Sequence, residues 1–278
     1  MDGILLINKP AGMTSHDVVN KIRRQFHIKK VGHCGTLDPD ATGVLVLCIG
    51  KATKALQFLT SEDKEYIATL SLGTSTDTYD ASGIVLETKT FHGVENVNEV
   101  LQSFVGKQMQ EPPLYSAIKV KGKKLYEYAR NHEQVEIPKR EIEIKNITLL
   151  SQDHSLIQFQ VTCSKGTYIR SLCVDIAKSL GYPGHMKELM RTRSGIFDIK
   201  DCYSLKDIEK GNYQLLTLEE AFQSFEKYVV DDENIVYHGK RIQSDIDHQV
   251  VVVNKDGKVL AVYGPDGHGY LKSVRGLF

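Results

Sequence analysis

The chain has 278 residues, 41% hydrophobic and 25% charged, with no net formal charge. This is the composition of a globular protein with a sizeable buried core. No apolar run approaches the ~20 residues that a membrane-spanning helix requires, and the first residues lack the basic start of a signal peptide, so we expect a cytosolic protein. The five cysteines are scattered without a C-x-x-C pair, which favours free buried thiols over disulfides or a zinc site.

The balanced charge is unevenly distributed along the chain. Residues 1–60 contain eight lysines and arginines against four acidic residues, whereas residues 201–235 contain three against nine. A local basic surface is sufficient to attract a polyanion even when the whole chain is neutral. The composition therefore leaves nucleic acid open as a partner and argues against indiscriminate nucleic-acid binding.

The N-terminal region reads as strand, helix, loop and strand. Residues 4–7 are apolar and predict a short strand. Thr14 and Asp17 have the spacing of a capping box, and apolar residues at helical spacing follow. After a loop at 33–43, the continuous apolar run 44–49 predicts a buried strand.

The loop at 33–43 contains two glycines, one proline and two aspartates, which is the composition of a tight turn. Asp38 therefore lies on a turn next to a buried strand. Two interpretations are open: the carboxylate caps the local backbone as an Asx-turn, or a rigid turn presents it to a substrate.

Alternating apolar residues predict a strand at 65–72, and helical spacing predicts a helix at 97–105. The segment 111–140 is different, because lysines and tyrosines alternate along it. A solvated surface loop is one interpretation. The other is a nucleic-acid-binding finger, in which cations contact phosphates and aromatic rings stack on bases.

Residues 142–149 and 157–163 read as a hairpin, with one irregularity in the first strand. A glycine turn then leads into a helix with Arg170 in its first turn, a geometry at which backbone N–H groups can face an anion. Near the C-terminus, the apolar runs 250–253 and 258–263 flank an Asp-Gly turn and predict a second hairpin. We place a domain boundary near residue 230.

The sequence lacks the motifs of several enzyme classes: it has no G-x-S-x-G, no H-E-x-x-H, no Walker-type P-loop and no G-x-G-x-x-G after a strand. We therefore expect neither a metal nor a cofactor. An aspartate is ionised at neutral pH, so Asp38 could attack an electrophilic carbon without a base. A neighbouring arginine would keep such a carboxylate charged and oriented.

Four segments resemble one family closely and occur in the family's order. They are residues 7–15 (INKPAGMTS), 33–43 (HCGTLDPDATG), 64–66 (KEY) and 163–172 (CSKGTYIRSL). The chain resembles the TruB family of bacterial tRNA pseudouridine-55 synthases over about residues 1–200.

The resemblance implies an α+β pseudouridine synthase fold, with a large mixed, mainly antiparallel sheet flanked by helices and loops. A catalytic domain would cover residues 1–230, with an RNA-clamping insertion at about 111–140. Residues 231–278 would form a short, β-rich PUA-like RNA-binding unit.

The implied reaction converts uridine-55 in the T-loop of tRNA to pseudouridine after base flipping. Asp38 matches the nucleophile, and its attack on C6 of the base or C1′ of the ribose stays open. The other matches are to substrate-binding residues: His33 near the flipped nucleotide, Tyr66 stacked on the base, Tyr168 and Leu189 in the uridine pocket, Arg170 paired with the nucleophile, and Asp80 as an acidic contact.

The implied partner is the T-arm stem-loop of tRNA. We expect no protein partner, no membrane and a monomer. Two alternatives remain at this point. A non-catalytic tRNA-binding or folding module would use Asp38 only structurally, and a nucleosidase-like hydrolase would release free uracil.

Overall fold

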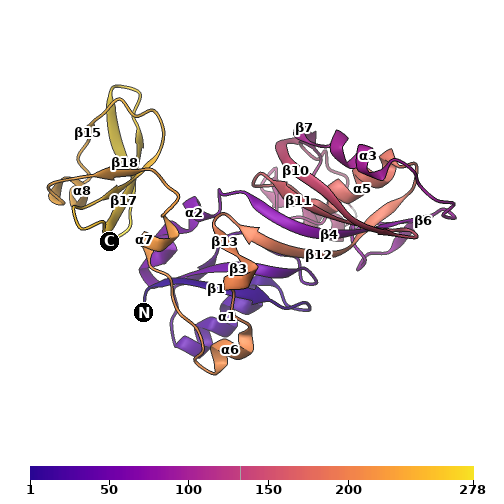
Figure 1. Ribbon diagram of the computed structural model, residues 1–278, viewed down its shortest axis with the longest axis horizontal. Coiled ribbons are helices and arrows are strands. Elements are labelled where there is room, and N and C mark those ends of the chain that lie inside the picture. Colours follow the sequence, from indigo (N-terminus) through magenta and orange to yellow (C-terminus); the bar gives the residue numbers. More distant parts are fainter. Residues whose placement is uncertain (132) are drawn as a thin grey trace. The chain divides into compact units, whose positions relative to one another are not determined.

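The computed structural model describes residues 1–131 and 133–278 and divides into two compact units. The first unit comprises Met1–Pro39, Gly43–Ser61 and Gly195–Phe278. The second comprises Asp40–Thr42 and Glu62–Ser194. Figure 1 shows the helices and strands of each unit, coloured along the sequence.

The centre of the first unit is strand β3 (Thr42–Ile49), which β1 (Gly3–Lys9) and β2 (Val31–His33) both pair with in antiparallel register. Every residue of β3 from Gly43 onward is buried, as the continuous apolar run predicted. The predicted strands at 4–7 and 44–49 are thus confirmed.

Helix α1 (Ser15–Phe26) begins at the predicted capping box. The Thr14 hydroxyl accepts the backbone N–H of Asp17, and the Asp17 carboxylate accepts the backbone N–H of Thr14. The helix buries one apolar stripe, including Val18 and Ile22, in a core shared with β1 and β3. The cap sets where α1 begins, and the apolar stripe packs the helix against the sheet.

Beyond β3, the first unit continues with short helices and one further strand before its C-terminal sheet. These elements are η1 (Gly50–Ala55), α2 (Leu56–Leu59), β13 (Phe197–Asp198), η2 (Ile199–Asp201), α6 (Leu205–Glu209) and α7 (Leu218–Ala221). Two segments bond to β1 through backbone hydrogen bonds, at Tyr203 with Leu6 and at Leu216 with Ile4.

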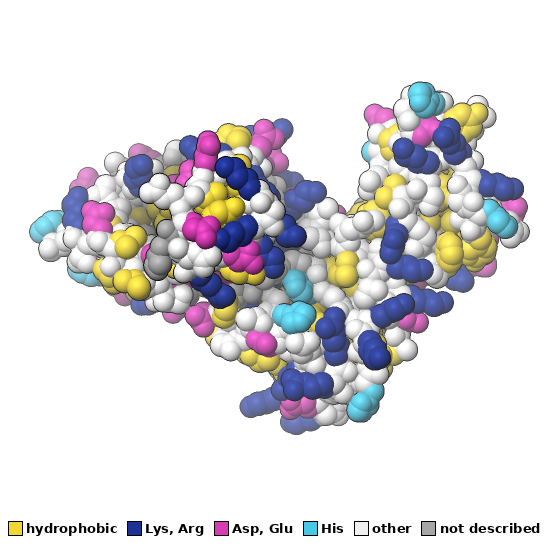
Figure 2. Space-filling view, turned by 180° about the vertical axis from the view of Figure 1, so that it is seen from behind, with side chains coloured by type: hydrophobic (Ala, Val, Ile, Leu, Met, Phe, Trp, Pro, Cys, Tyr) yellow, Lys and Arg dark blue, Asp and Glu magenta, His cyan; other side chains and the backbone are white. Residues whose placement is uncertain are grey.

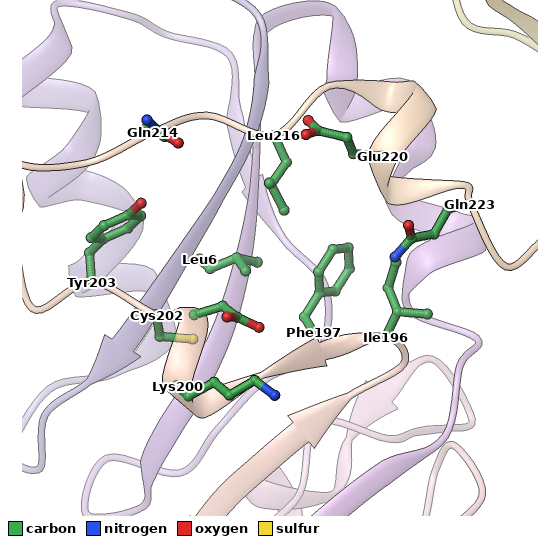
Figure 3. A pocket seen from close by; sticks show the side chains of 11 residues that line it. Leu6, Ile196, Phe197, Lys200, Cys202, Tyr203, Gln214, Leu216, Glu220 and Gln223 are labelled. Atoms are coloured by element: carbon green, nitrogen blue, oxygen red, sulfur yellow. The ribbon is translucent and has the colours of Figure 1, made fainter. Parts of the chain in front are cut away.

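A cavity of about 500 Å³ lies beside β1, between these two segments (Figure 3). Leu6, Phe197 and Leu216 provide apolar lining, and Lys200 and Glu220 are among its polar residues. None of the predicted site residues is among the residues that line it.

The C-terminal part of the first unit is a 5-stranded sheet. Its order is β14 (Lys227–Val229), β16 (Val250–Val253), β17 (Val259–Pro265), β18 (Tyr270–Gly276) and β15 (Ile242–Gln243), and α8 (Asn234–Tyr237) accompanies it. The predicted hairpin at 250–263 is confirmed. Val251 and Val262 share a hydrophobic cluster with Leu6 and Val46. A separate domain from residue 231 stays a prediction.

The second unit contains an antiparallel sheet. Its order is β12 (Gly184–Ser194), β4 (Lys64–Leu72), β11 (Leu156–Cys163), β10 (Arg140–Asp153) and β7 (Gly106–Gln110). The predicted hairpin of β10 and β11 is confirmed, with two register shifts in place of the one expected irregularity. Strand β12 was not predicted, because register shifts interrupt its alternation.

Helices and two small hairpins complete the second unit. They are β5 (Thr74–Thr76) with β6 (Val85–Thr88), α3 (Val97–Ser103), β8 (Lys119–Val120) with β9 (Lys123–Lys124), α4 (Leu125–Arg130) and α5 (Ile169–Ser179). The predicted helix at 97–105 is two residues shorter at its end. Mixed helices and mainly antiparallel strands make the chain an α+β protein, as predicted.

Candidate active site

The loop that carries Asp38 is fixed to the start of α1 through Ser15. The Ser15 hydroxyl accepts the backbone N–H of Leu37 at 2.8 Å and donates to the carbonyl of Leu37 at 3.2 Å. Both Ser15 and Leu37 are buried, while Asp38 itself is half-buried. The backbone on the N-terminal side of Asp38 is therefore held by a side chain from another element.

The other side of Asp38 is held by Lys9, whose side chain is completely buried at the end of β1. Its ammonium donates to the carbonyl oxygens of Pro10, Met13 and Pro39, at 2.9, 2.6 and 2.8 Å. A buried lysine requires such partners, because an ammonium removed from water without them is very costly. Lys9 thus joins the turn after β1 to the residue that follows Asp38.

His33 ends β2, where it pairs with Leu47 of β3. The backbone N–H of the next residue, Cys34, continues this pairing by donating to Val46. The Cys34 thiol is buried 3.7 Å from that of Cys48. Contact with Cys34 and burial raise the pKa of the Cys48 thiol. The strand and these thiols anchor the start of the Asp38 loop in the core.

Tyr66 and Leu189 lie on neighbouring strands of the second unit. Tyr66 of β4 is 9% exposed and pairs with Arg191 of β12, while Leu189 pairs with Ala68 of β4. Paired residues of antiparallel strands project to the same face, as do residues two apart on one strand. Tyr66 and Leu189 therefore share one face of this sheet.

Tyr168 caps the N-terminus of α5 and is held by a side chain that was not predicted. Gln110, buried at the end of β7, accepts the Tyr168 N–H at 2.8 Å and donates to its carbonyl at 3.0 Å. This reciprocal pair fixes the backbone at Tyr168 and sets where α5 begins. No sequence motif marks Gln110, because the contact joins residues 58 positions apart.

Arg170 lies in the first turn of α5, as predicted, and is only 6% exposed. Its guanidinium donates to the carbonyls of Thr78 and Tyr115, both at 3.0 Å, and pairs with the Asp80 carboxylate at 3.5 Å. Arg170 therefore joins α5, the loop after β5 and the base of the segment 111–140. Its predicted pairing with Asp38 stays a prediction.

Asp80 is tied into its own loop as well as to Arg170. Its carboxylate accepts the Thr78 hydroxyl at 2.7 Å, and the backbone N–H and hydroxyl of Ser82 at 3.0 and 2.6 Å. Such an arrangement holds the loop in one conformation. In the second unit, Asp80 orients Arg170, and a direct contact of Asp80 with substrate stays a prediction.

Glu65, next to Tyr66 on β4, is a charged group within the sheet. Burial opposes its ionisation, yet its pKa is below the ordinary value because Thr192, Gln160, Arg193 and Thr162 stabilise the carboxylate. The Thr192 hydroxyl donates at 2.8 Å, and Arg193 lies 3.7 Å away. This network fixes the start of β4, beside Tyr66, to the neighbouring strands β11 and β12.

The segment 111–140 pairs cations with tyrosine rings. Lys124 and Arg130 both lie over the ring of Tyr126, each 5.3 Å from its centre, and Lys123 lies over Tyr128. Lys123 also forms an ion pair with Glu133, whereas Lys119 and Lys121 are exposed. His132 lies outside the described residues. The segment therefore has local order and two exposed lysines near its tip.

The part of the chain that the structure describes contains neither a cluster of metal-binding side chains nor a membrane-spanning helix. No three His, Cys, Asp or Glu side chains in residues 1–131 and 133–278 gather in a way that could hold a metal ion. Over the same residues, no helix is long and apolar enough to cross a membrane.

The predicted site residues are thus distributed over both units. His33 and Asp38 lie in the first unit, and Tyr66, Asp80, Tyr168, Arg170 and Leu189 lie in the second. Contacts inside the units bring Arg170 to Asp80 and place Tyr66 and Leu189 on one face. That Asp38 faces Tyr66 and Arg170 stays a prediction.

An antiparallel α+β fold with a carboxylate on a braced loop is compatible with a base-modifying enzyme, and comparison with known proteins defines the class. Residues 23–169 match the N-terminal domain of the TruB family pseudouridylate synthases, and residues 170–230 match the tRNA pseudouridylate synthase B C-terminal domain. The chain belongs to the TruB family.

Similar proteins include two named tRNA pseudouridine synthase B. The protein of Oceanobacillus iheyensis is 47% identical over 294 residues, and that of Bacillus cereus is 44% identical over 298 residues. Each match covers 99% of this chain and 97% of the relative. Among solved structures, a chain of a Cbf5-Nop10-Gar1 complex superposes with a TM-score of 0.78 at 25% identity, covering 99% of this chain and 85% of that chain.

Proposed function

We propose that this protein converts uridine-55 in the T-loop of tRNA to pseudouridine, with Asp38 as the nucleophile. The observation that carries the proposal is its 44–47% identity, over almost the whole chain, to proteins named tRNA pseudouridine synthase B. The bracing of the Asp38 loop by Lys9 and Ser15 supports the role of that residue.

The reaction is an isomerisation and consumes no other reagent. The Asp38 carboxylate attacks C6 of the base or C1′ of the ribose of a uridine flipped out of the loop. The bond between N1 and C1′ breaks, the base rotates, a new bond forms between C5 and C1′, and the bond between the Asp38 oxygen and the nucleotide breaks to restore the free carboxylate. The proton on C5 is lost, and N1 gains a proton.

The second unit supplies the environment for the base in this proposal. Tyr66 stacks on the uracil ring, which offsets part of the few kcal/mol that extraction of a base costs. Leu189, on the same face, and Tyr168 line the pocket, and His33 occupies space beside the flipped nucleotide. Arg170 keeps the nucleophile ionised, and Asp80 orients Arg170.

Tritium release from tRNA labelled at C5 of uridine tests the activity directly, since only loss of the C5 hydrogen yields the signal. The wild-type protein should release about one equivalent per tRNA. Asp38→Asn should abolish release while the Kd for tRNA changes less than about threefold, because the carboxylate is one contact among many. Release by Asp38→Asn at the wild-type rate would refute the nucleophile.

The products distinguish the alternatives. A non-catalytic tRNA-binding module predicts binding with no release of tritium. A nucleosidase-like hydrolase predicts free uracil, which chromatography detects. We further propose that the protein acts as a monomer in the cytoplasm and that residues 111–140 clamp the T-arm, which the cation–tyrosine pairs of that segment support.

A further inference from the structure

A group of exposed cations lies in the first unit at the end of α1 and the start of η1. We define the α1–η1 patch as Arg24, Lys29, Lys30 and Lys51, all of them exposed. In Figure 2, lysine and arginine side chains gather on the lower part of the first unit, where Figure 1 shows α1 and α6. Four of the eight lysines and arginines of residues 1–60 therefore belong to this patch.

Two hydrogen bonds hold together the segments of chain that carry the four residues. The Arg23 guanidinium donates to the carbonyl of Val31 at 2.8 Å, which fixes the end of α1 against the start of β2. The Gly50 N–H donates to the carbonyl of Lys30 at 2.8 Å, which places Lys51 beside Lys30. The patch is therefore built on ordered backbone from three elements.

The charge of the patch is largely uncompensated. None of its four cations forms an ion pair with a carboxylate in the described part of the chain. The nearby carboxylate is Asp2, whose Oδ1 accepts the backbone N–H of Lys51. Exposed cations without acidic partners are the surface that attracts phosphates.

Within the same unit, the patch lies at the ends of α1 and β2 that are away from the Asp38 loop, because β2 runs from Val31, next to Lys30, to His33, where that loop begins. Ser15, at the first turn of α1, contacts Leu37 of that loop, whereas Arg24 lies in the last turn. The nine residue steps from Ser15 to Arg24 span about 14 Å at 1.5 Å per residue. Helix α1 and strand β2 therefore hold the patch at a fixed place relative to the loop of the proposed nucleophile.

We propose that the α1–η1 patch binds phosphates of tRNA outside the T-arm, as a second RNA contact. This inference rests on the proposed function, which makes tRNA the substrate. In the proposed function the T-arm contacts Asp38 and the segment 111–140, and the patch lies at the end of α1 away from the loop that carries Asp38. A whole tRNA carries further phosphates that an isolated T-arm hairpin lacks.

The test compares two RNAs and two triple variants. The patch variant is Arg24→Gln, Lys29→Gln and Lys30→Gln. The control removes the same charge from three exposed lysines on α5, η2 and β14: Lys178→Gln, Lys200→Gln and Lys227→Gln. Kd is measured for full-length tRNA and for a T-arm hairpin between 50 and 200 mM salt, and tritium release is measured with both RNAs.

The patch variant should raise the Kd for full-length tRNA about tenfold and lower its salt dependence by two to three units, since each lost phosphate contact removes roughly 0.7–0.9. Its Kd for the hairpin and its release of tritium from the hairpin should equal the wild-type values. The control variant should bind both RNAs, and release tritium from both, as the wild type does. An unchanged Kd for full-length tRNA, or an equal loss with the hairpin, would overturn the proposal.

Cations near a helix C-terminus also stabilise the helix dipole, which is a purely structural explanation of the patch. That explanation predicts a lower melting temperature for the patch variant with no change in tRNA affinity. This outcome would also overturn the proposal. If the proposed activity itself were absent, tritium release would be missing from every variant, whereas the two binding comparisons would still report on the patch.

Discussion

The Lys9 ammonium donates to the carbonyl of Pro39 at 2.8 Å, directly after Asp38. The residues lie 30 positions apart, and the Lys9 side chain has no exposed surface. The charged side chain of Lys9, a residue type that usually lies on the protein surface, is therefore buried. We infer that it positions the proposed nucleophile through the backbone and does not touch the substrate.

Replacing Lys9 with methionine should lower both stability and turnover. The side chain keeps its approximate length, but three carbonyls lose their donor, and unfulfilled buried acceptors cost about 1–3 kcal/mol each before relaxation. We expect a loss of about 3 kcal/mol in the free energy of unfolding in urea, and a lower kcat with little change in Kd for tRNA. Lys206→Met, at an exposed position, should change stability by less than about 0.5 kcal/mol. Equal effects of the two substitutions would contradict the positioning role.

Arg170 and Asp80 should be coupled in stability but unequal in catalysis. Arg170→Gln removes donors from the Thr78 and Tyr115 carbonyls as well as the ion pair, so it should cost about 2–4 kcal/mol, and Asp80→Asn about 1 kcal/mol. A double-mutant cycle by urea unfolding should give a coupling of about 1 kcal/mol.

The kcat values of the same variants separate two roles of Arg170. If Arg170 also pairs with Asp38, Arg170→Gln should lower kcat at least tenfold more than Asp80→Asn does, at a temperature where both remain folded. Equal losses of kcat would show that Arg170 acts only through the loop that carries Asp80.

The Glu65 network predicts a defined pH dependence of stability. The folded pKa of Glu65 is depressed, so the unfolded state binds this proton more readily, and the stabilisation is present above the ordinary glutamate pKa. It is lost as the pH falls through the folded value. Glu65→Gln should therefore cost about 1 kcal/mol at pH 7, after allowance for partial exposure, and progressively less below pH 4.5. Urea unfolding of the wild type and of Glu65→Gln at pH 7 and below pH 4.5 measures this effect. An equal difference in the free energy of unfolding at the two pH values would argue against the network.

Four lysines of the segment 111–140, Lys119, Lys121, Lys123 and Lys124, should not contribute equally to RNA binding. Lys119 and Lys121 are exposed, whereas Lys123 is paired with Glu133 and Lys124 lies over Tyr126. Replacing Lys119 and Lys121 with glutamine should reduce the salt dependence of T-arm hairpin binding by about 1.4–1.8 units. Lys123→Gln should change it by less than half as much per residue. An unchanged slope in the first variant would place the clamp elsewhere.

Local patterns predicted the elements whose stabilising contacts are local or regularly spaced. The capping box at Thr14 and Asp17 and the turn at Asp256 and Gly257 are readable because their partners are a few residues away. The run at 44–49 is readable because every residue in it is buried.

The features that sequence patterns missed depend on distant partners. Strand β12 contains a buried arginine, Arg191, and two register shifts, so its period-two pattern is interrupted. Lys9 and Gln110 look like surface residues in the sequence, but each satisfies backbone groups far along the chain. Such contacts follow from the packing of elements and from no local periodicity.

Helix α1 also bears on which RNAs the enzyme would accept. Its first turn holds the Asp38 loop through Ser15, and its last turn carries Arg24. Consider an RNA that has the T-loop sequence but no further folded RNA that extends to the last turn of α1. Such an RNA would bind at Asp38 without the phosphate contacts to the α1–η1 patch. A stem-loop in another transcript would then be a poorer substrate than a complete tRNA, so the length of one helix would help to discriminate among cellular RNAs.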